Sequence, residues 1–459
     1  MVAFAAFPFR ATPAQLPDGA TPPTAEALAA RIDSVVTTDI LPRGFPSVSI
    51  AVTRGGQTLL EKAWGVANIG TGQHAEPATL YRIGSVSKQF TAALVLKLVD
   101  AGKLSLTDSI GRYLKGLRPD FSSITIEQLL NHTSGLARDY MQMSRESANL
   151  PGDSLIALAA RDTLVSRPGT VYAYSNTGYM VLGVLIQKMY GKPYDAVLRD
   201  EIARPLGLTS LGWCENMAGP RAATGYLRSS DGKASLRGEQ HASQLIGPGG
   251  ICSTAGDLAR WNHALHGGRV LSAASYAAMT TPRGAADRYG FGLLLRKSVW
   301  GSPAIVHDGQ GGGFSAHNAW FAAESLSVTL VYNALPRLEV QMADFIGLIA
   351  LGGQPRPIPP IPVIELPIAA TQGPGRPPFV GAYEISSRAR FIVTFEEGNL
   401  YVTPPGGKRQ QLFLQSGTTY TLGSPGSATI VTFHVDSDGV VTGFTARDNG
   451  VDRELRKVK

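Results

Sequence analysis

The sequence predicts an α+β protein in which an antiparallel sheet carries helices on its faces, followed by a small all-β domain. Two pairs of β-rich segments bracket a largely helical region from about residue 85 to residue 285. Strand pairs that enclose such a region are typical of folds in which helices cover an antiparallel sheet. Beyond a proline-rich stretch, short alternating segments are separated by turns at intervals of roughly 8–12 residues, which indicates a small sandwich or barrel.

The first expected element is an amphipathic helix that begins near Thr24, directly after two prolines. Its apolar residues recur at every fourth position, so they share one face that can dock on the sheet. These residues are Leu28, Ile32, Val36 and Ile40.

The two β-rich pairs lie near the two ends of the first domain. The stretch "PSVSIAVTRGGQTLLEKAWGV" (46–66) has strand-like segments on either side of Gly55 and Gly56, which predicts a hairpin. A second pair follows much later, as "AIVHDG" (304–309) and "HNAWFAAESLSVTLVYN" (317–333). We expect both pairs to contribute to the antiparallel sheet.

A domain boundary is expected where nine prolines fall between Pro355 and Pro378. Such a stretch cannot form a helix and favours an extended spacer. The expected organisation is a leading tail (1–24), a main domain (25–352), a proline-rich linker (353–378) and a β-rich domain (379–459).

Composition excludes several classes of protein. The 459 residues are 44% hydrophobic, which is enough to bury a large core. The net charge of +7 comes from scattered residues, so no nucleic-acid partner is expected. No uncharged apolar run reaches the ~18 residues that a membrane span needs.

The location of the protein is left open by two features. The opening "MVAFAAFPFRATPAQ" is apolar like the end of a secretory signal but lacks the basic leading region of such signals, so a periplasmic or secreted location is expected, with the cytoplasm as the alternative. Cys214 and Cys252 would permit one disulfide in an oxidising compartment, and two free buried thiols are an equally open alternative.

A serine and a lysine lie three residues apart in "YRIGSVSKQFTAAL" (81–94), at the start of an apolar helix that closes near Gly102. Residues at this spacing share one helix face, so the amine of Lys88 can reach the hydroxyl of Ser85. A lysine can take the proton of a serine nucleophile when burial or a neighbouring cation lowers the lysine pKa. The pair is a candidate catalytic site, and the alternative is a serine cap with a solvent-exposed lysine.

The same Ser-x-x-Lys pattern recurs at Ser230 and Lys233, in the polar loop "SSDGK". No apolar helical period follows it. We therefore interpret this second pair as a solvated turn.

Two further motifs add to the first pair. Tyr174 and Asn176 form the only Tyr-x-Asn in the chain, about 90 residues after Ser85, and an apolar helix follows them. A phenol near a lysine can shuttle a proton, and a carboxamide can bind a substrate amide. The third motif, His307-Asp308-Gly309, ends a predicted strand before a run of glycines, where backbone approaches something closely.

Together these motifs resemble the serine β-lactamase and penicillin-binding-protein family, in particular its class C-like branch with D-aminopeptidases, DD-carboxypeptidases and related esterases. Flanking stretches typical of that family are "LLNHTSGL" (129–136), "RPLGLTSLGW" (204–213) and "GPGGICSTAGDLARW" (247–261). The resemblance covers about residues 25–350. It implies a β-lactamase/transpeptidase-like sheet with helices on both faces plus a helical subdomain, and the C-terminal segment resembles the lipocalin-like barrel of some peptidase members.

The resemblance implies a role for each residue of the first two motifs. Ser85 would be the nucleophile, and Lys88 would be its general base or the partner of that base. Tyr174 would relay the proton to the leaving group, and Asn176 would bind the amide side of the substrate. The implied enzyme is a serine hydrolase that forms an acyl-enzyme on short amide or ester substrates, of the D-amino-acid peptidase or carboxylesterase type, without a cofactor.

The third motif would complete the site. The backbone N–H groups of Ser85 and Gln310 would form the oxyanion hole, and His307 and Gly309 would line the substrate side. His307 stands where lysine is typical of the wider family, which removes a fixed positive charge that would attract a substrate carboxylate. This substitution counts against efficient β-lactam hydrolysis.

Alternatives to this reading are a class C-like β-lactamase and a non-catalytic ligand-binding relative of penicillin-binding proteins. The complete Ser85, Lys88 and Tyr174 set argues against the second. The expected partner is a small-molecule or short-peptide substrate, and the sequence does not determine the oligomeric state.

Two other histidine motifs are interpreted as structural. His263 and His266 have a spacing that suits metal ligands on a helix, but no third ligand cluster accompanies them, so no metal site is expected. His132 in "LLNHTSGL" is interpreted as a hydrogen-bonding residue rather than a second catalytic base.

Overall fold

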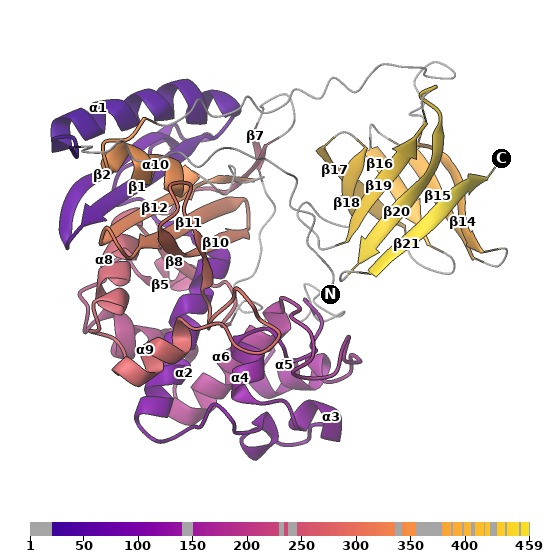
Figure 1. Ribbon diagram of the computed structural model, residues 1–459, viewed down its shortest axis with the longest axis horizontal. Coiled ribbons are helices and arrows are strands. Elements are labelled where there is room, and N and C mark those ends of the chain that lie inside the picture. The colour runs from indigo at the N-terminus through magenta and orange to yellow at the C-terminus, as the bar shows by residue number, and fades with distance from the viewer. Residues whose placement is uncertain are drawn as a thin grey trace. The chain divides into compact units, whose positions relative to one another are not determined.

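The chain divides into two compact units, residues 1–358 and residues 359–459, in the computed structural model (Figure 1). The structure describes residues 21–139, 150–228, 234–236, 246–335, 342–354, 379–386, 389–396, 399–404, 409–416, 418–422, 429–436, 438–448 and 451–458. Three expectations therefore lie outside the described residues: most of the leading tail, the proline-rich stretch 355–378, and the Ser230–Lys233 pair.

A seven-stranded antiparallel sheet forms the centre of the first unit, in the order β3-β2-β1-β12-β11-β10-β9. Strand β1 pairs with β12, so the two β-rich pairs from opposite ends of the domain meet in one sheet, as predicted. The tight turn between β1 and β2 is made by Gly55 and Gly56, whose φ angles of 55° and 86° favour glycine. The strands are β1 (Ser47–Arg54), β2 (Gln57–Asn68), β3 (Gln73–His74), β9 (Leu294–Lys297), β10 (Pro303–Gly311), β11 (Phe314–Phe321) and β12 (Leu326–Tyr332).

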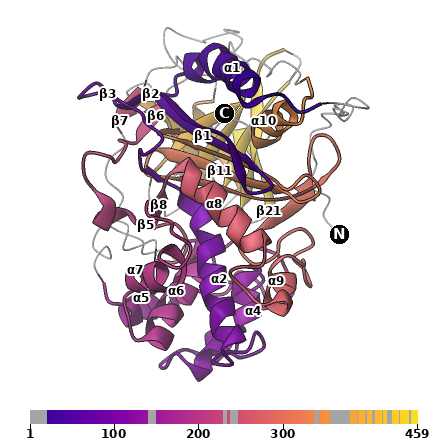
Figure 2. The ribbon, with the colours of Figure 1, turned by 90° about the vertical axis from the view of Figure 1, so that its left-hand side faces the viewer.

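Helices cover both faces of this sheet. Helices α1 (Ala25–Val35) and α10 (Met342–Ala350) lie on one face, and α8 (Ala255–His266) lies on the other (Figure 2). The predicted α+β class, with an antiparallel sheet between helical layers, is confirmed.

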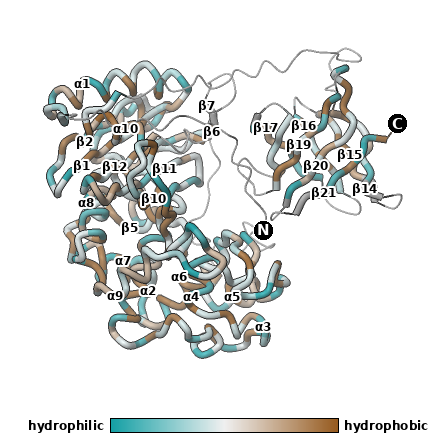
Figure 3. The backbone as a smooth tube through the Cα atoms, in the orientation of Figure 1, coloured by the Kyte–Doolittle hydropathy of each residue, from teal (hydrophilic) through white to brown (hydrophobic). Residues whose placement is uncertain are grey.

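The first predicted helix is present from its expected start. The hydroxyl of Thr24 accepts the N–H of Ala27 at 3.2 Å, which caps α1. Both hydrophilic and hydrophobic residues occur along α1 (Figure 3). The chain then continues as one π-helical turn, Val36–Ile40. Apolar residues at every fourth position are spaced more widely than one turn of an α-helix, so they would drift away from the buried face. The wider π-helical turn keeps Val36 and Ile40 on that face. The four apolar residues of the pattern, Leu28, Ile32, Val36 and Ile40, are all buried.

The helical subdomain inserts between β2 and β9. Its central helix, α2 (Ser87–Asp100), is buried over most of its length and ends where Gly102 adopts a left-handed φ of 66°, as the sequence predicted. The other helices are α3 (Pro119–Ser122), α4 (Ile126–Leu130), α5 (Gly152–Ala159), α6 (Asn176–Tyr190), α7 (Tyr194–Leu198) and α9 (Ala273–Met279).

Two small sheets border this subdomain. One has the order β4-β8-β5 and contains β4 (Tyr81–Arg82), β8 (Ile251–Ser253) and β5 (Gly212–Trp213). The other has the order β13-β6-β7 and contains β13 (Ala334–Leu335), β6 (Tyr226–Arg228) and β7 (Ala234–Leu236). A disulfide joins Cys214 to Cys252, which resolves the alternative between a bridge and two free thiols.

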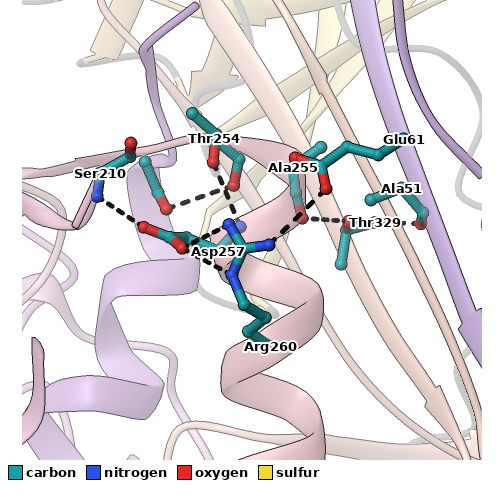
Figure 4. Close-up of polar contacts among 9 residues, drawn as sticks. Ala51, Glu61, Ser210, Thr254, Ala255, Asp257, Arg260 and Thr329 are labelled. Atoms are coloured by element: carbon teal, nitrogen blue, oxygen red, sulfur yellow. Dashed lines mark hydrogen bonds and ion pairs between the residues drawn. The ribbon is translucent and has the colours of Figure 1, made fainter. Parts of the chain in front are cut away.

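A buried carboxylate anchors the start of α8 (Figure 4). Asp257 accepts hydrogen bonds from the Arg260 guanidinium at 2.7 and 2.9 Å and from the backbone N–H of Ser210 at 2.6 Å. The backbone N–H of Asp257 donates to Thr254, the N-cap of the helix, at 3.1 Å. Because the buried charge has these donors, it ties α8 to the segment before β5 rather than destabilising the core.

The second unit is a closed eight-stranded barrel in which consecutive strands are neighbours and β14 pairs with β21. Its strands are β14 (Gly381–Ser386), β15 (Ala389–Glu396), β16 (Asn399–Thr403), β17 (Gln410–Ser416), β18 (Thr419–Leu422), β19 (Ile430–Val435), β20 (Val441–Asp448) and β21 (Val451–Val458). The expected all-β C-terminal domain is therefore present, as a barrel rather than a sandwich.

Aromatic side chains fill the inside of the barrel. The ring of Phe433 contacts those of Phe379 and Phe444 at centroid distances of 4.6 and 5.4 Å, and Tyr383 and Tyr420 pack around it. Eight strands enclose a space just wide enough for side chains or for one small ligand. Among the described residues, these rings pack on one another in the core of the barrel.

Within the described part of the chain, no helix combines the length and the apolar character that crossing a bilayer requires.

Candidate active site

The predicted nucleophile lies at the entry to the buried helix α2. Ser85 is in a single 3-10 turn, Gly84–Val86, and its side chain is partly exposed. The backbone N–H of Ile83, just before this turn, donates to the carbonyl oxygen of Ile251 in β8 at 3.1 Å. The turn is thus held by the sheet next to it, and the serine remains accessible to a substrate.

Lys88, one turn further along, is fully buried, and its Nζ atom contacts three oxygen atoms. It lies 3.1 Å from Oγ of Ser85, 2.8 Å from Oδ1 of Asn176 and 3.0 Å from the carbonyl oxygen of Pro248. A neutral amine has two N–H donors and one lone pair, and the amide and carbonyl oxygens can only accept. In the neutral form the two N–H groups can donate to Asn176 and Pro248, and the lone pair can then accept the hydroxyl proton of Ser85.

Electrostatics favour this neutral form of Lys88. Burial is the main cause that lowers the pKa of Lys88 well below its usual range, and the Arg138 guanidinium lowers it further. The carboxylate of Asp139 acts in the opposite direction and is the weaker influence. The buried lysine is thus better suited to act as a base than an exposed lysine is.

Asn176 is held in one amide orientation at the first position of α6. Its Nδ2 donates to Oδ1 of Asp139 at 2.9 Å, and its Oδ1 accepts from Lys88. The preceding Ser175 caps the helix by accepting the N–H of Gly178 at 3.0 Å. Because Ser175 caps the helix, the side chain of Asn176 is not needed as a cap and faces Lys88.

Tyr174 lies beside Lys88, and the side chains of Lys88 and Arg138 both lie near its ring. Nζ of Lys88 is 4.8 Å from the ring centroid, and Cζ of Arg138 is 5.3 Å from it. Desolvation raises the pKa of Tyr174 well above its usual range, and a hydrogen bond with Ser85 only partly offsets this. The phenol is therefore protonated in the free site, and it can pass on a proton but cannot serve as a resting base.

The third motif packs directly against the serine turn. A Cβ atom on Gly309 would lie 1.8 Å from the carbonyl oxygen of Ile83 and 3.1 Å from the backbone nitrogen of Ser85. A Cβ atom on Gly84 would lie 2.5 Å from the backbone nitrogen of Gln310. Only glycine permits this approach, which packs β10 against the serine turn and places the two backbone segments that carry the N–H groups of Ser85 and Gln310 side by side.

His307 faces the same side as the catalytic motifs, whereas its neighbour Asp308 does not. His307 is buried and hydrogen-bonds to Tyr289 at 2.8 Å. Asp308 follows the other face of β10 and contacts Nδ1 of His317 across the strand pair at 2.6 Å. The third motif therefore supplies a histidine and a close-packed glycine to the site.

The structure brings the seven predicted site residues into one place: Ser85, Lys88, Tyr174, Asn176, His307, Gly309 and Gln310. It also adds residues that sequence reasoning missed, namely Arg138, Asp139, Tyr172, Tyr179 and Tyr289. Arg138 and Asp139 follow the flanking stretch 129–136 by two and three positions, but neither belongs to a motif that would have singled it out.

The histidine pair on α8 has other partners. His263 hydrogen-bonds to the hydroxyl of Thr53 at 2.7 Å, and Nδ1 of His266 hydrogen-bonds to Tyr276 at 2.8 Å. Over the described residues, no group of three or more His, Cys, Asp or Glu side chains is arranged to hold a metal ion.

The fold and these motifs define the class of β-lactamase-like proteins, in which a serine and a lysine lie at the entry to a buried helix beside an antiparallel sheet. The chain belongs to the Beta-lactamase family, whose model matches residues 28–351. Members of this family include hydrolases such as D-aminopeptidase and D-amino acid amidase.

Individual relatives agree with this assignment. The D-aminopeptidase of Gluconobacter oxydans is 27% identical over 71% of this chain and 63% of its own length. The crystal structure of a D-amino acid amidase from Ochrobactrum anthropi, complexed with L-phenylalanine amide, is 26% identical over 71% of this chain and 97% of that one, with a TM-score of 0.60. An octameric penicillin-binding protein homologue from Pyrococcus abyssi covers 93% of this chain with a TM-score of 0.63 at 22% identity and is similar in fold.

Proposed function

We propose that this chain is a serine hydrolase that cleaves short amides or esters through an acyl-enzyme, with amides of D-amino acids as the preferred substrates. The observation that carries the proposal is the environment of Lys88. Its amine is buried and lies 3.1 Å from Oγ of Ser85, and the oxygen atoms of Asn176 and Pro248 can accept its N–H groups.

In the proposed acylation step, Lys88 takes the hydroxyl proton as Oγ of Ser85 attacks the substrate carbonyl carbon. The carbonyl oxygen becomes an oxyanion that the N–H groups of Ser85 and Gln310 stabilise. One such donor contributes roughly 10²–10³ in rate in other enzymes. The C–N or C–O bond then breaks as the Tyr174 hydroxyl protonates the leaving group.

Lys88, now an ammonium ion, returns its proton to Tyr174, which restores both groups. A water molecule then attacks the ester bond to Ser85, and the same base takes a proton from this water. Release of the carboxylic acid regenerates the serine hydroxyl. The cycle needs no metal or cofactor because each proton transfer uses a side chain of the site.

The preference for amino-acid amides rests on the charges around Asn176. The carboxylate of Asp139 contacts the amide nitrogen of Asn176 at 2.9 Å and the Arg138 guanidinium at 3.7 Å, and it is 42% exposed, so a substrate ammonium can compete with Arg138 for it. An aminoacyl substrate carries such an ammonium two bonds from the carbonyl that Ser85 attacks. The relatives named as D-aminopeptidase and D-amino acid amidase support the same substrate class.

The proposal is tested on four chromogenic or amide substrates: the amides of D- and L-phenylalanine, a short p-nitrophenyl ester, and a chromogenic cephalosporin. We expect turnover of the D-amide and the ester, weaker turnover of the L-amide, and little turnover of the cephalosporin. Ser85→Ala and Lys88→Ala should each abolish turnover. Ser230→Ala, in the other Ser-x-x-Lys pair, is the matched control and should leave the rate unchanged.

Three results would contradict the proposal. Equal rates for wild type and Ser85→Ala would exclude the serine mechanism. Turnover of the cephalosporin alone would favour the β-lactamase alternative, and absence of both turnover and fluorophosphonate labelling would favour a non-catalytic binding protein.

We also propose a periplasmic or secreted location. The disulfide between Cys214 and Cys252 supports it, because such bonds persist in oxidising compartments. Recovery of the protein only from the cytoplasmic fraction, with both thiols reduced, would contradict it.

A further inference from the structure

His132 follows helix α4 in a backbone conformation that glycine usually adopts. Its φ angle is 61°, and the N–H of Thr133 donates to the carbonyl oxygen of Gln128 at 2.9 Å, as in a Schellman motif. A non-glycine residue in this conformation costs about 1 kcal/mol. Strain of this kind at a site of side-chain contacts points to a function for the side chain.

Three contacts of His132 surround Tyr174. Its carbonyl oxygen accepts the backbone N–H of Ala173 at 2.8 Å, and its Nδ1 accepts the backbone N–H of Ser175 at 3.0 Å. Its ring also packs on the ring of Tyr174, with the centroids 4.3 Å apart. One residue therefore holds the backbone on both sides of the tyrosine and the face of its ring.

The position of His132 excludes a role as a proton acceptor. Because Nδ1 accepts from Ser175, the neutral ring carries its proton on Nε2. Burial, and then the charge of Lys88, lowers the pKa of His132 well below its usual range. Nε2 is buried without a hydrogen-bond partner among the described residues, and the rings of Tyr172 and Tyr289 lie 6.0 and 4.7 Å away, centroid to centroid.

We infer that His132 is a positioning residue that fixes the Tyr174 hydroxyl at the place where the leaving group departs from Ser85. The inference rests on the proposed function, because it assigns His132 to the proton relay of that reaction. It deepens the sequence interpretation of His132 as a hydrogen-bonding residue by naming what the hydrogen bond holds.

Two variants separate the parts of this role. His132→Asn keeps an acceptor for the N–H of Ser175 and suits the left-handed backbone. His132→Leu removes the acceptor and leaves that N–H buried and unpaired. Thr133→Val is the matched control, because it removes a buried hydrogen bond of the same turn, from the Thr133 hydroxyl to Asn131 at 2.7 Å, without touching Tyr174.

The readout compares two substrates with the same acyl group, the p-nitroanilide and the p-nitrophenyl ester of D-phenylalanine. The anilide must be protonated as it leaves, whereas nitrophenolate leaves without a proton. We expect His132→Leu to lower kcat/KM for the anilide about 100-fold, the scale of general acid catalysis, and to change the ester value less than about 10-fold. His132→Asn should recover most of the loss, and Thr133→Val should lower neither value appreciably.

The outcomes distinguish this inference from the proposed function. Equal losses on both substrates, or no loss in His132→Leu, would overturn the inference while leaving the serine mechanism in place. If wild type and Ser85→Ala were equally inactive, the proposed function would fail, and crystal structures of the two His132 variants would decide the inference. Displacement of Tyr174 in His132→Leu but not in His132→Asn supports it, and an unmoved tyrosine in both overturns it.

Discussion

The hydroxyl of Tyr289 lies 2.8 Å from Nε2 of His307 and hydrogen-bonds to it. The other ring nitrogen, Nδ1, lies 2.7 Å from the carbonyl oxygen of Asp308, which can only accept, so Nδ1 carries a proton. In the neutral ring Nε2 therefore accepts the tyrosine proton. The third motif thus presents an imidazole with both ring nitrogens in hydrogen bonds where a lysine would place a fixed charge.

The first prediction concerns the effect of placing a lysine charge at position 307. His307→Lys should raise kcat/KM for a carboxylate-bearing cephalosporin relative to D-phenylalanine amide by about tenfold, equivalent to about 1.4 kcal/mol. The added ammonium attracts the carboxylate and repels the substrate ammonium. His307→Gln, which adds no charge, is the control and should leave the ratio unchanged. An unchanged ratio in the lysine variant would show that this position does not face the substrate charge.

A second prediction concerns the pH dependence of acylation. Protonated Lys88 cannot take the proton of Ser85, so kcat/KM should rise with pH as the lysine loses its proton. Arg138 is one of the causes that lower this pKa. Arg138→Gln should therefore raise the pKa of Lys88 and move the ascending limb to higher pH.

The pH profile of kcat/KM checks this shift, with Arg118→Gln as the control. Arg118 pairs with Asp120 at 3.0 Å and is not among the groups that shift the pKa of Lys88. A limb that stays in place in Arg138→Gln, or moves equally in the control, would mean that the limb belongs to another group.

Much of the fold could be predicted because it depends on local patterns. The every-fourth-residue pattern from Leu28 to Ile40 marks a buried helix face, and Gly55–Gly56 marks a hairpin. The sequence left open the contacts between residues that lie far apart in the chain. The disulfide depends on β5 and β8 being neighbours, which brings Cys214 and Cys252 together across 38 positions, and no local signal reports that distance.

The site divides in the same way. Ser85 and Lys88 are three residues apart, so helix geometry alone predicts their contact. Asp139 and Tyr289 act through tertiary contacts, with Asn176 and His307 respectively. Their partners lie far away in sequence or outside any motif, so only the folded chain identifies them.

A third prediction tests the close approach at Gly309. A side chain there would collide with the carbonyl oxygen of Ile83, 1.8 Å from the new Cβ atom, and push the strand away from the serine turn. Gly309→Ala should lower kcat/KM for the anilide about 100-fold or more, since both oxyanion donors move. Gly70→Ala is the control because only the Asn68 side chain lies near its Cβ position, at 3.3 Å. Wild-type activity in Gly309→Ala would exclude Gln310 from the oxyanion hole.

The last prediction concerns the disulfide on the strand that supports the serine turn. Cys252 lies in β8, opposite Arg82 in β4, and its bond to Cys214 closes a loop over a separation of 38 residues. Closing a loop of this length stabilises a folded chain by roughly 4 kcal/mol in the chain-entropy model. A reductant should therefore lower the free energy of unfolding of the wild type, measured by urea denaturation, by about that amount. The double variant Cys214→Ser, Cys252→Ser should show the lower value without reductant and no further loss with it. If the two proteins unfold at the same urea concentration under oxidising conditions, then the bridge contributes nothing to stability and β8 is held by its strand pairing and by its packing on α2 alone.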